Sequence, residues 1–442
     1  MRIFKILFFS VLSLFANQDS LYIKSIDSLT IIKNFDKILK NDSNLFISYQ
    51  LSSFNLQDKE VVYVKKKHNK TVDTILVYDE SIINMKITNR ILNPYLHSHI
   101  GDQYYQIGDE IVKKYYFITE IPKYNFGIIG SGKLGAMFSL NPKFNSLFTS
   151  LVGINNENGL KINGEINMHS ENFLKNAEIF DIYWKKTDSI SQIMKFGVFI
   201  PHPFSFDLGF DWKYHYEIFN AFYIKNENRV MLQTFIPLLS NVKIGFVKGQ
   251  TNITDKGRKN DYEALSYNAF SIAIYNDKRN DRLLPYIGSL VNLIFDGGLD
   301  RDKFYFNSST KMISYYNLSK NVSLRFQWIM QGLYYHNHII PKSRYLFFGG
   351  GTTLRGYQEQ TFKSTQYQVH TLELIYNQIS NFQTNLFIDL GTVNLNPLSK
   401  YILGFGIGMT QINDNYIIKL EYALSNSNFK DGKIHLKWIS RF

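Results

Sequence analysis

Residues 347–357 read Phe347-Phe348-Gly349-Gly350-Gly351-Thr352-Thr353-Leu354-Arg355-Gly356-Tyr357, which places one arginine between glycines in a region of otherwise alternating apolar and polar residues. Further along the chain, Phe387-Ile388-Asp389-Leu390-Gly391 has one acidic residue on the polar face of a predicted strand. A charge removed from bulk water is costly unless it is paired. We therefore expect the arginine loop to fold back into a β-barrel, where a salt bridge between Arg355 and Asp389 holds it.

The segment from residue 143 to Phe442 consists of short runs that alternate with a period of two. The clearest run places Leu403, Phe405, Ile407 and Met409 on one face, with three glycines and a threonine between and after them. This period is typical of membrane barrels, although a soluble β-sandwich shows it too. Other runs carry Arg, Lys, Glu and Gln on the polar face, which a wet lumen tolerates better than a packed core. The segment has about 300 residues, and a spanning strand needs roughly 9–11 residues plus a connection. These lengths predict an all-β transmembrane antiparallel barrel of about 16 strands.

The composition fits this fold and excludes several kinds of site. The chain contains 36 Phe and 30 Tyr but 4 Trp, and outer-membrane barrels carry aromatic girdles at both interfaces. It has no cysteine, which excludes disulfides, thiolate metal ligands and a cysteine nucleophile. The net charge of +12 is spread along the chain and does not form the basic patch that is typical of nucleic-acid binding.

The first 142 residues do not show the alternating pattern of the barrel segment and are predicted to contain three parts. Residues 1–16 have the charged start and apolar run of a signal peptide. Residues 17–68, with a predicted helix over 28–40 and two short strands, are interpreted as a partial module. Residues 69–142 have the β-α-α-β-β order of a small α+β domain, with helices predicted around 85–92 and 108–114. No later apolar run is long enough for a membrane-spanning helix, so residues 143–442 must form a closed barrel if they cross a membrane.

Strand phase supports the proposed pairing independently. If Ile388 and Leu390 face lipid, then Asp389 faces the lumen, because successive side chains of a strand point to opposite faces. In the same way, Glu373 faces the lumen if its two leucine neighbours face lipid. Both acids are therefore predicted to point at the space that Arg355 would occupy.

Over residues 285–442 the chain resembles the BamA/TamA and two-partner-secretion transporter superfamily in the order and spacing of several motifs. The lid-loop motif of that superfamily is similar to Gly349-Gly350 followed by Leu354-Arg355-Gly356-Tyr357 in this chain. The next barrel motif of the superfamily is similar to Phe387-Ile388-Asp389-Leu390-Gly391. Further matching positions are Glu373, the turn residues Pro285 and Gly288, and the terminal Phe442. The segments 17–68 and 69–142 resemble POTRA domains.

The resemblance implies an outer-membrane protein, not an enzyme, that inserts or exports β-rich client polypeptides and keeps its N-terminal region in the periplasm. It implies no catalytic residue, cofactor or metal. The implied partners are unfolded outer-membrane or secreted polypeptides, outer-membrane lipid and accessory lipoproteins, and no nucleic acid. Glu373 and Asp389 are implied as lumen partners of Arg355, and Tyr357 as a contact to the inner wall. A weak seam is implied between a strand near Leu147–Asn155 and the strand that ends at Phe442.

Other functions stay open on the sequence. A dedicated two-partner secretion transporter is expected to carry a plug helix, and none is evident after the signal peptide. A passive outer-membrane channel would explain the barrel but not the N-terminal modules or the lid-loop motif. An outer-membrane enzyme needs a set of catalytic side chains at the edge of the lumen, and the sequence offers no convincing set.

Overall fold

A computed structural model describes residues 20–24, 47–55, 60–67, 71–78, 82–98, 102–129, 133–155, 161–188, 190–379, 381–393, 401–425 and 432–442 of the chain. The predicted signal peptide and the predicted helix over 28–40 lie outside these residues. Contacts between Cα atoms divide the chain into two compact units. The larger unit contains Tyr78–Ile91, Gly108–Lys123 and Ser139–Phe442, and the smaller contains the rest of the first 138 residues.

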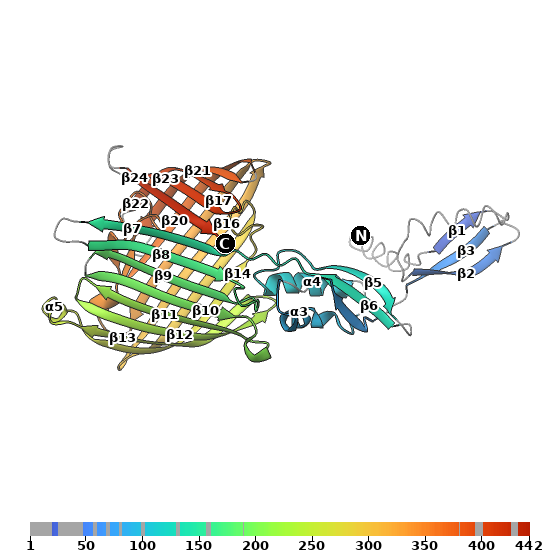
Figure 1. Cartoon of the computed structure of the whole chain (residues 1–442), viewed down its shortest axis with the longest axis horizontal. Coiled ribbons are helices and arrows are strands. Elements are labelled where there is room, and N and C mark those ends of the chain that lie inside the picture. The colour runs from blue at the N-terminus through green and yellow to red at the C-terminus, as the bar shows by residue number, and fades with distance from the viewer. Residues whose placement is uncertain are drawn as a thin grey trace, which may run out of the picture. The chain divides into compact units, whose positions relative to one another are not determined.

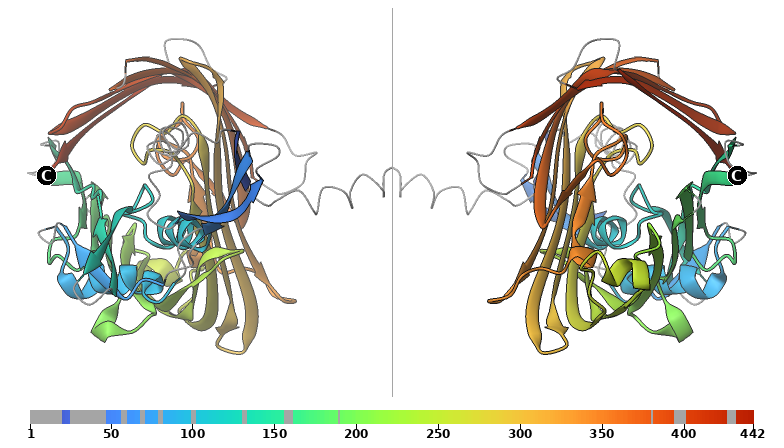
Figure 2. Two further views of the ribbon diagram at one scale, coloured as in Figure 1. Left: turned by 90° about the vertical axis from the view of Figure 1, so that its right-hand side faces the viewer. Right: turned by 90° about the vertical axis from the view of Figure 1, so that its left-hand side faces the viewer.

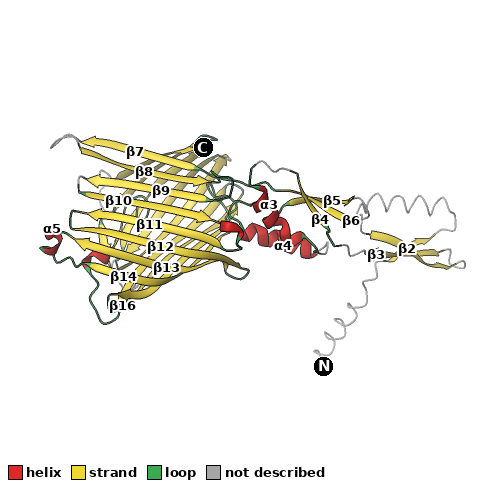
Figure 3. Cartoon of the chain, turned by 60° about the horizontal axis from the view of Figure 1, so that its bottom comes forward, coloured by secondary structure: helices red, strands yellow, loops and turns green. Residues whose placement is uncertain are grey.

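Sixteen antiparallel strands of the described chain close into a barrel, as the sequence predicts (Figure 1). Each pairs with its neighbours in sequence, and the circle closes between the last strand and the first. Strands make up its wall (Figure 3). The strands are β7 (Leu147–Asn155), β8 (Lys161–Glu171), β9 (Ile179–Asp188), β10 (Ser191–Ile200), β11 (Gly209–Phe219), β12 (Tyr223–Ile236), β13 (Ser240–Ile253), β14 (Leu265–Asp277), β15 (Gly288–Asp300), β16 (Lys303–Ser319), β17 (Val322–Tyr335), β20 (Gln366–Ile379), β21 (Phe382–Thr392), β22 (Ile402–Ile412), β23 (Tyr416–Ser425) and β24 (Lys433–Arg441).

The alternation read from the sequence becomes an outer and an inner face. Leu386 and Ile388 on β21 are 56% and 48% exposed, whereas Phe387 and Asp389 between them are 2% and 0% exposed. We call the end where β7 begins and β24 finishes the proximal end of the barrel, and the opposite end the distal end. The lid loop, residues 336–365, leaves the distal end of β17 and returns to β20. It contains the short elements η3 (Lys342–Arg344), β18 (Leu346–Phe348) and β19 (Phe362–Ser364), of which β18 and β19 pair with each other.

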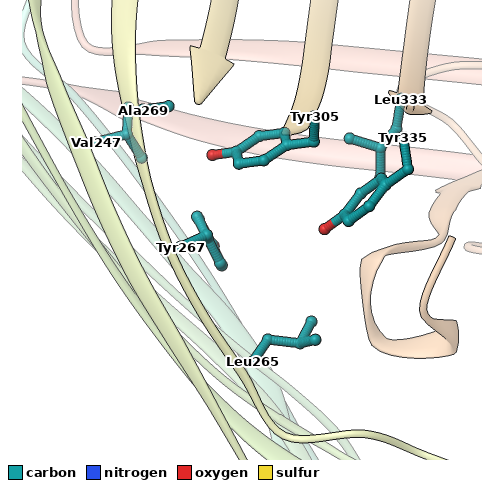
Figure 4. Close-up of a cluster of buried hydrophobic side chains, with 7 residues drawn as sticks. All are labelled: Val247, Leu265, Tyr267, Ala269, Tyr305, Leu333 and Tyr335. Atoms are coloured by element: carbon teal, nitrogen blue, oxygen red, sulfur yellow. The ribbon is translucent and has the colours of Figure 1, made fainter. Parts of the chain in front are cut away.

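The lid loop folds into the barrel (Figure 2). Its side chains give the lumen an apolar core, which the sequence-based expectation of a wet lumen did not include. Phe348 and Leu354 of the loop are buried against Ile329, Tyr367 and Val369 of the wall. A second buried cluster lines the inner wall towards the distal end (Figure 4), and Ile340 of the lid loop packs against it. Its members are Val247, Leu265, Tyr267, Ala269, Tyr305, Leu333 and Tyr335.

The region before the barrel contains two three-stranded sheets. One has the order β1-β3-β2 and is formed by β1 (Ser20–Lys24), β2 (Ile47–Asn55) and β3 (Glu60–Lys67). The other has the order β4-β6-β5 and belongs to the chain order β4 (Thr74–Val77), α3 (Met85–Leu92), η1 (Asn93–Tyr95), α4 (Asp102–Lys114), β5 (Lys123–Ile129) and β6 (Lys133–Ser139). This is the predicted β-α-α-β-β order, although α4 begins at Asp102 and is longer than expected. The predicted domain limits at residues 17–68 and 69–142 stay predictions.

Candidate functional site

The guanidinium of Arg355 lies inside the barrel and is held on one side by Asp389. The Nε and Nη2 groups donate to the two carboxylate oxygens of Asp389 over 2.8 Å each. The backbone N–H of Arg355 donates to the same carboxylate over 3.1 Å. The ring of Phe387 lies beneath the charge, with its centroid 3.4 Å from the guanidinium carbon. Two parallel hydrogen bonds and an aromatic face fix both the position and the plane of the guanidinium.

Two further carboxylates complete the surroundings of Arg355. Its Nη1 group lies 2.6 Å from an oxygen of Glu373 and 2.8 Å from an oxygen of Glu421. The four side chains are at most 7% exposed. The structure therefore brings Glu373 and Asp389 to the arginine as the sequence implied, and it adds Glu421, which sequence reasoning did not connect to the loop.

Two more cations balance the acids. Arg325 on β17 pairs with Glu373 at 2.8 Å, and Lys419 on β23 pairs with Glu421 at 3.1 Å. With Arg355 and Asp389 the cluster has three positive and three negative charges. A cluster of this size can stay charged away from bulk water, because every ion has at least one partner of opposite sign. Arg325 and Glu421 each lie on the polar side of an alternating run in the sequence, but strand periodicity gives only the face on which a residue lies.

Glycines let the lid loop approach the wall closely. Gly356 has a φ of +90°, and a Cβ there would lie 2.5 Å from the carbonyl oxygen of Leu424. On the facing strand, a Cβ at Gly404 would lie 2.2 Å from the carbonyl oxygen of Arg355. The backbone of the loop can therefore lie against β22 and β23 only because both positions lack a side chain.

The rest of the lid-loop motif fixes the loop beside the charge cluster. Leu354 is fully buried, and one of its methyl groups would lie 3.1 Å from a Cβ at Gly391. The hydroxyl of Tyr357 donates to the carbonyl oxygen of Leu403 over 2.9 Å, which is the expected contact to the inner wall. Gly349 and Gly350 both have positive φ, at +116° and +89°, where the loop turns before the arginine.

The remaining motif residues lie away from the charge cluster, at the proximal end. Pro285 is buried in the turn before β15, and Gly288 opens that strand with a φ of +102°. Phe442 is 66% exposed, and its backbone N–H donates to the carbonyl oxygen of Ser146 over 3.2 Å. On the outer face of β24, Leu436 is 65% exposed.

The seam between β24 and β7 has little strand pairing. Its register contains only the pairs Ser440–Phe148 and Arg441–Leu147 within the described residues. On its other side, β24 pairs with β23 along the whole range from Lys433 to Ser440. The seam therefore lies where the resemblance implied it, and among the described residues most of the backbone of β24 that faces β7 has no ladder partner.

The lid loop approaches β24 from within and also reaches β9, which lies two strands beyond β7 on the other side of the seam. On the β24 side, a Cβ at Gly351 would lie 3.1 Å from Nδ1 of His435. On the other side, the carboxylate of Glu359 lies 4.0 Å from the ammonium of Lys185 on β9. Glu359 also accepts from the backbone N–H of Gly351 over 3.0 Å, which joins the two contacts within the loop.

Comparison with known proteins defines the class to which this barrel belongs. The model of the Omp85 superfamily domain matches residues 172–428, and the chain therefore belongs to the Omp85 superfamily. Such a barrel is an outer-membrane barrel, and proteins of this family handle client polypeptides. A search of curated proteins gives no match.

Solved structures share the fold at low sequence identity. BamA from Haemophilus ducreyi lacking POTRA domains 1–3 has a TM-score of 0.54 and 14% identity, with 94% of this chain and 93% of that chain covered. CdiB from Acinetobacter baumannii has a TM-score of 0.57 and 14% identity, with 94% and 81% covered. CdiB from Escherichia coli has a TM-score of 0.55 and 12% identity, with 94% and 84% covered.

Two features are absent from the part of the chain that the structure describes. No described helix combines the length and the apolar character that a membrane crossing needs. The same residues hold no group of three or more His, Cys, Asp or Glu side chains arranged to bind a metal ion.

Proposed function

We propose that this protein inserts or exports β-rich client polypeptides at the outer membrane by opening the seam between β24 and β7. The observation that carries the proposal is the pairing of these two strands through Ser440–Phe148 and Arg441–Leu147 alone in the described chain. A client strand cannot enter lipid with unpaired amides and carbonyls, because each unsatisfied group costs several kcal/mol. A barrel edge that opens offers such a strand its hydrogen-bond partners without nucleotide hydrolysis.

Strand length supports an opening at this place. β7 and β24 have 9 residues each, whereas β16 on the far side of the barrel order has 17. A shorter wall spans less of the hydrocarbon layer, and the bilayer thins to match it. The lipid beside the seam therefore presents a smaller barrier to an incoming strand than lipid elsewhere around the barrel.

The lid loop has the complementary role of keeping the lumen occupied and the wall in register. Arg355 anchors it through Asp389, Glu373 and Glu421, and the loop also lies beside β24 and reaches β9. A loop fixed in this way argues against a steady, wide passive pore. We propose no enzymatic role, because the charged side chains of the cluster are committed to one another.

The N-terminal region is proposed to lie in the periplasm, where an exposed sheet edge binds an unfolded client by strand addition. The β4-β6-β5 sheet offers the edge strands β4 and β5 for this purpose. Accessory lipoproteins are further proposed partners. General assembly and dedicated two-partner secretion differ only in the client. Depletion of the protein followed by a census of outer-membrane barrels distinguishes them, because broad loss indicates assembly and loss of one exported protein indicates dedicated secretion.

A disulfide across the seam tests the opening directly. The chain has no cysteine, so Phe148→Cys with Ser440→Cys introduces a single pair at positions that face each other in the register. The matched control joins Leu420→Cys and Leu436→Cys, which face each other on β23 and β24 and do not cross the seam. We expect oxidation of the seam pair to block insertion of a barrel client into liposomes, reductant to restore it, and the control pair to have no effect. Undiminished insertion with a locked seam refutes the proposal.

A further inference from the structure

The turn between β14 and β15, residues 278–287, sends an arginine across the proximal mouth of the barrel. Arg282 in this turn bonds to Glu171, the last residue of β8. In the barrel order, β9 to β13 lie between β8 and β14 on the shorter side. The two residues therefore belong to nearly opposite parts of the wall, and their contact spans the opening.

The contact is a buried, two-pronged ion pair. Nη1 and Nη2 of Arg282 donate to the two oxygens of Glu171 over 2.7 and 3.0 Å. The side chain of Glu171 is 1% exposed. Nη2 also donates to the carbonyl oxygen of Lys143 over 2.9 Å, and the guanidinium lies 5.5 Å from the ring centroid of Tyr116. His169 adds a 2.9 Å contact to the same carboxylate. A parallel pair of charge-assisted hydrogen bonds gives this contact both strength and a fixed geometry.

Glu171 is bonded to the segment that enters the seam strand β7. Its carboxylate accepts from the backbone N–H of Asn145 over 2.7 Å, and its own N–H donates to the hydroxyl of Ser146 over 3.0 Å. The carbonyl oxygen of Ser146 in turn accepts from the N–H of Phe442. Glu171 thus fixes the start of β7 and, through Ser146, also Phe442, which follows β24.

The turn itself is built to hold Arg282 in place. The side-chain oxygen of Asn280 accepts from the N–H groups of Tyr286 and Ile287 over 3.0 Å each. At Gly288 the backbone has positive φ, and a Cβ would lie 2.1 Å from the carbonyl oxygen of Lys278. The Pro-x-x-Gly motif therefore closes a rigid turn, and this is a structural role for two motif residues that the lid cluster does not use.

We propose that Arg282 and Glu171 are positioning residues that form a brace across the proximal mouth and set the position of the start of β7, so that the closed seam depends on them. The brace acts on the seam strand from the turn of a distant hairpin. With two ladder pairs at the seam, the alignment of β7 with β24 rests largely on how the start of β7 is held. Loss of the brace lets this segment move and separates the two seam strands without unfolding the barrel.

The test measures the seam without any client, although the importance of the seam rests on the proposed function. The reporter is the rate at which the pair Phe148→Cys and Ser440→Cys forms a disulfide in the full chain in detergent. We expect Arg282→Ala to slow this reaction several-fold. The control, Arg279→Ala, removes an ion pair to Asp277 within the same turn and should leave the rate unchanged.

Two further variants keep the test decisive if Arg282→Ala folds poorly. Glu171→Gln retains the side-chain oxygen that accepts from Asn145 but loses its charge, and it should slow the reaction in the same direction. Arg282→Lys keeps the charge without the fork and should give an intermediate rate. Heat-modifiable gel mobility shows that each barrel is intact. The brace is refuted if Glu171→Gln and Arg282→Lys both form the disulfide at the same rate as the protein that carries only the two cysteines.

The brace and the proposed function fail in different ways. If the brace variants leave the disulfide rate unchanged while a locked seam still blocks client insertion, the brace is wrong and the proposed function stands. If the variants slow the disulfide but a locked seam inserts clients normally, the brace stands and the proposed function is wrong.

Discussion

Removal of the lid-loop arginine gives the sharpest test of how the lumen is organised, and its cost follows from the contacts that remain. In Arg355→Ala, Glu373 keeps Arg325 at 2.8 Å and Glu421 keeps Lys419 at 3.1 Å. Asp389 loses its only ion-pair partner among the described residues, although it is 0% exposed.

The variant therefore leaves one buried carboxylate without a counter-charge. Asp389 keeps the hydroxyl of Thr371 at 2.8 Å and the backbone N–H of residue 355. Breaking a buried ion pair from one side costs about 3–5 kcal/mol, because the other charge stays buried. We expect Arg355→Ala to lower the free energy of unfolding by this amount while the strands still form.

Denaturant unfolding in detergent, followed by the fluorescence of the 4 tryptophans, measures this difference. The control is Arg258→Ala on α5 (Asp255–Arg258), since that side chain is 73% exposed and makes one contact of 3.8 Å to Asp255. Asp389→Asn in the Arg355→Ala background removes the orphan charge, so the double variant should be more stable than the sum of the two single effects predicts. A result for Arg355→Ala within about 1 kcal/mol of the Arg258→Ala result refutes the reasoning.

A charge swap separates a simple pair from the observed cluster. For an isolated pair, Arg355→Asp with Asp389→Arg should restore part of the lost stability. In the cluster, an aspartate at 355 would lie near both Glu373 and Glu421, which now contact Arg355 at 2.6 and 2.8 Å. We therefore expect the swapped protein to be no more stable than Arg355→Ala, as unfolding under the same conditions would show.

Three further perturbations test other parts of the same structure. Gly356→Ala should cost on the order of 1–3 kcal/mol of unfolding free energy, because the loop backbone has positive φ there. Gly297→Ala, with no atom within 4 Å of the added Cβ, should cost clearly less. Burial lowers the pKa of His202 below 6.5, so the neutral ring that contacts Tyr115 at 2.9 Å contributes stability that is complete above pH 6.5 and decreases as the pH falls from there towards the lowered pKa. Hydrogen exchange of residues 201–208, corrected for intrinsic rates, should show more opening at about pH 5.5 than at about pH 7.5, and His202→Gln should remove the difference. Glu359→Gln should change the unfolding free energy by under about 1 kcal/mol, because its ion pair is long and partly exposed; a loss above 2 kcal/mol, as a rough limit, would show that this contact carries the lid.

The sequence predicted the barrel and the faces of its strands, because both follow from local periodicity. The exposure of Ile388 beside the buried Asp389 is one such prediction that the structure confirms. It did not predict that Glu421 meets Arg355, because these two residues come from a loop and a strand that are far apart in sequence. Whether two inward residues touch depends on the shear at which the barrel closes and on the depth to which the loop folds back. Neither quantity appears in the pattern of a single strand.

The apolar lumen core was missed for a related reason. Phe348 and Leu354 lie in a glycine-rich loop, where apolar residues carry no periodic signal, and they find their partners only after the loop has folded back. The Pro285 motif was recognised as a turn, but its effect on Arg282 depends on a contact across the barrel mouth. In each case the missing information is a contact between residues that strand pairing does not bring together.

The backbone contacts across the seam of this barrel lie near its proximal end, and this has a consequence for how it opens. Two ladder pairs fix it near the proximal end, where the brace through Glu171 also acts. Further along, no ladder pair joins β24 to β7 among the described residues; the lid loop lies beside His435 of β24, and the weak pair of Glu359 with Lys185 joins the loop to β9, two strands beyond β7. A ladder opens by breaking successive backbone bonds. The distal part of the seam, with no described ladder pair, should therefore part first, and the proximal pairs should part last.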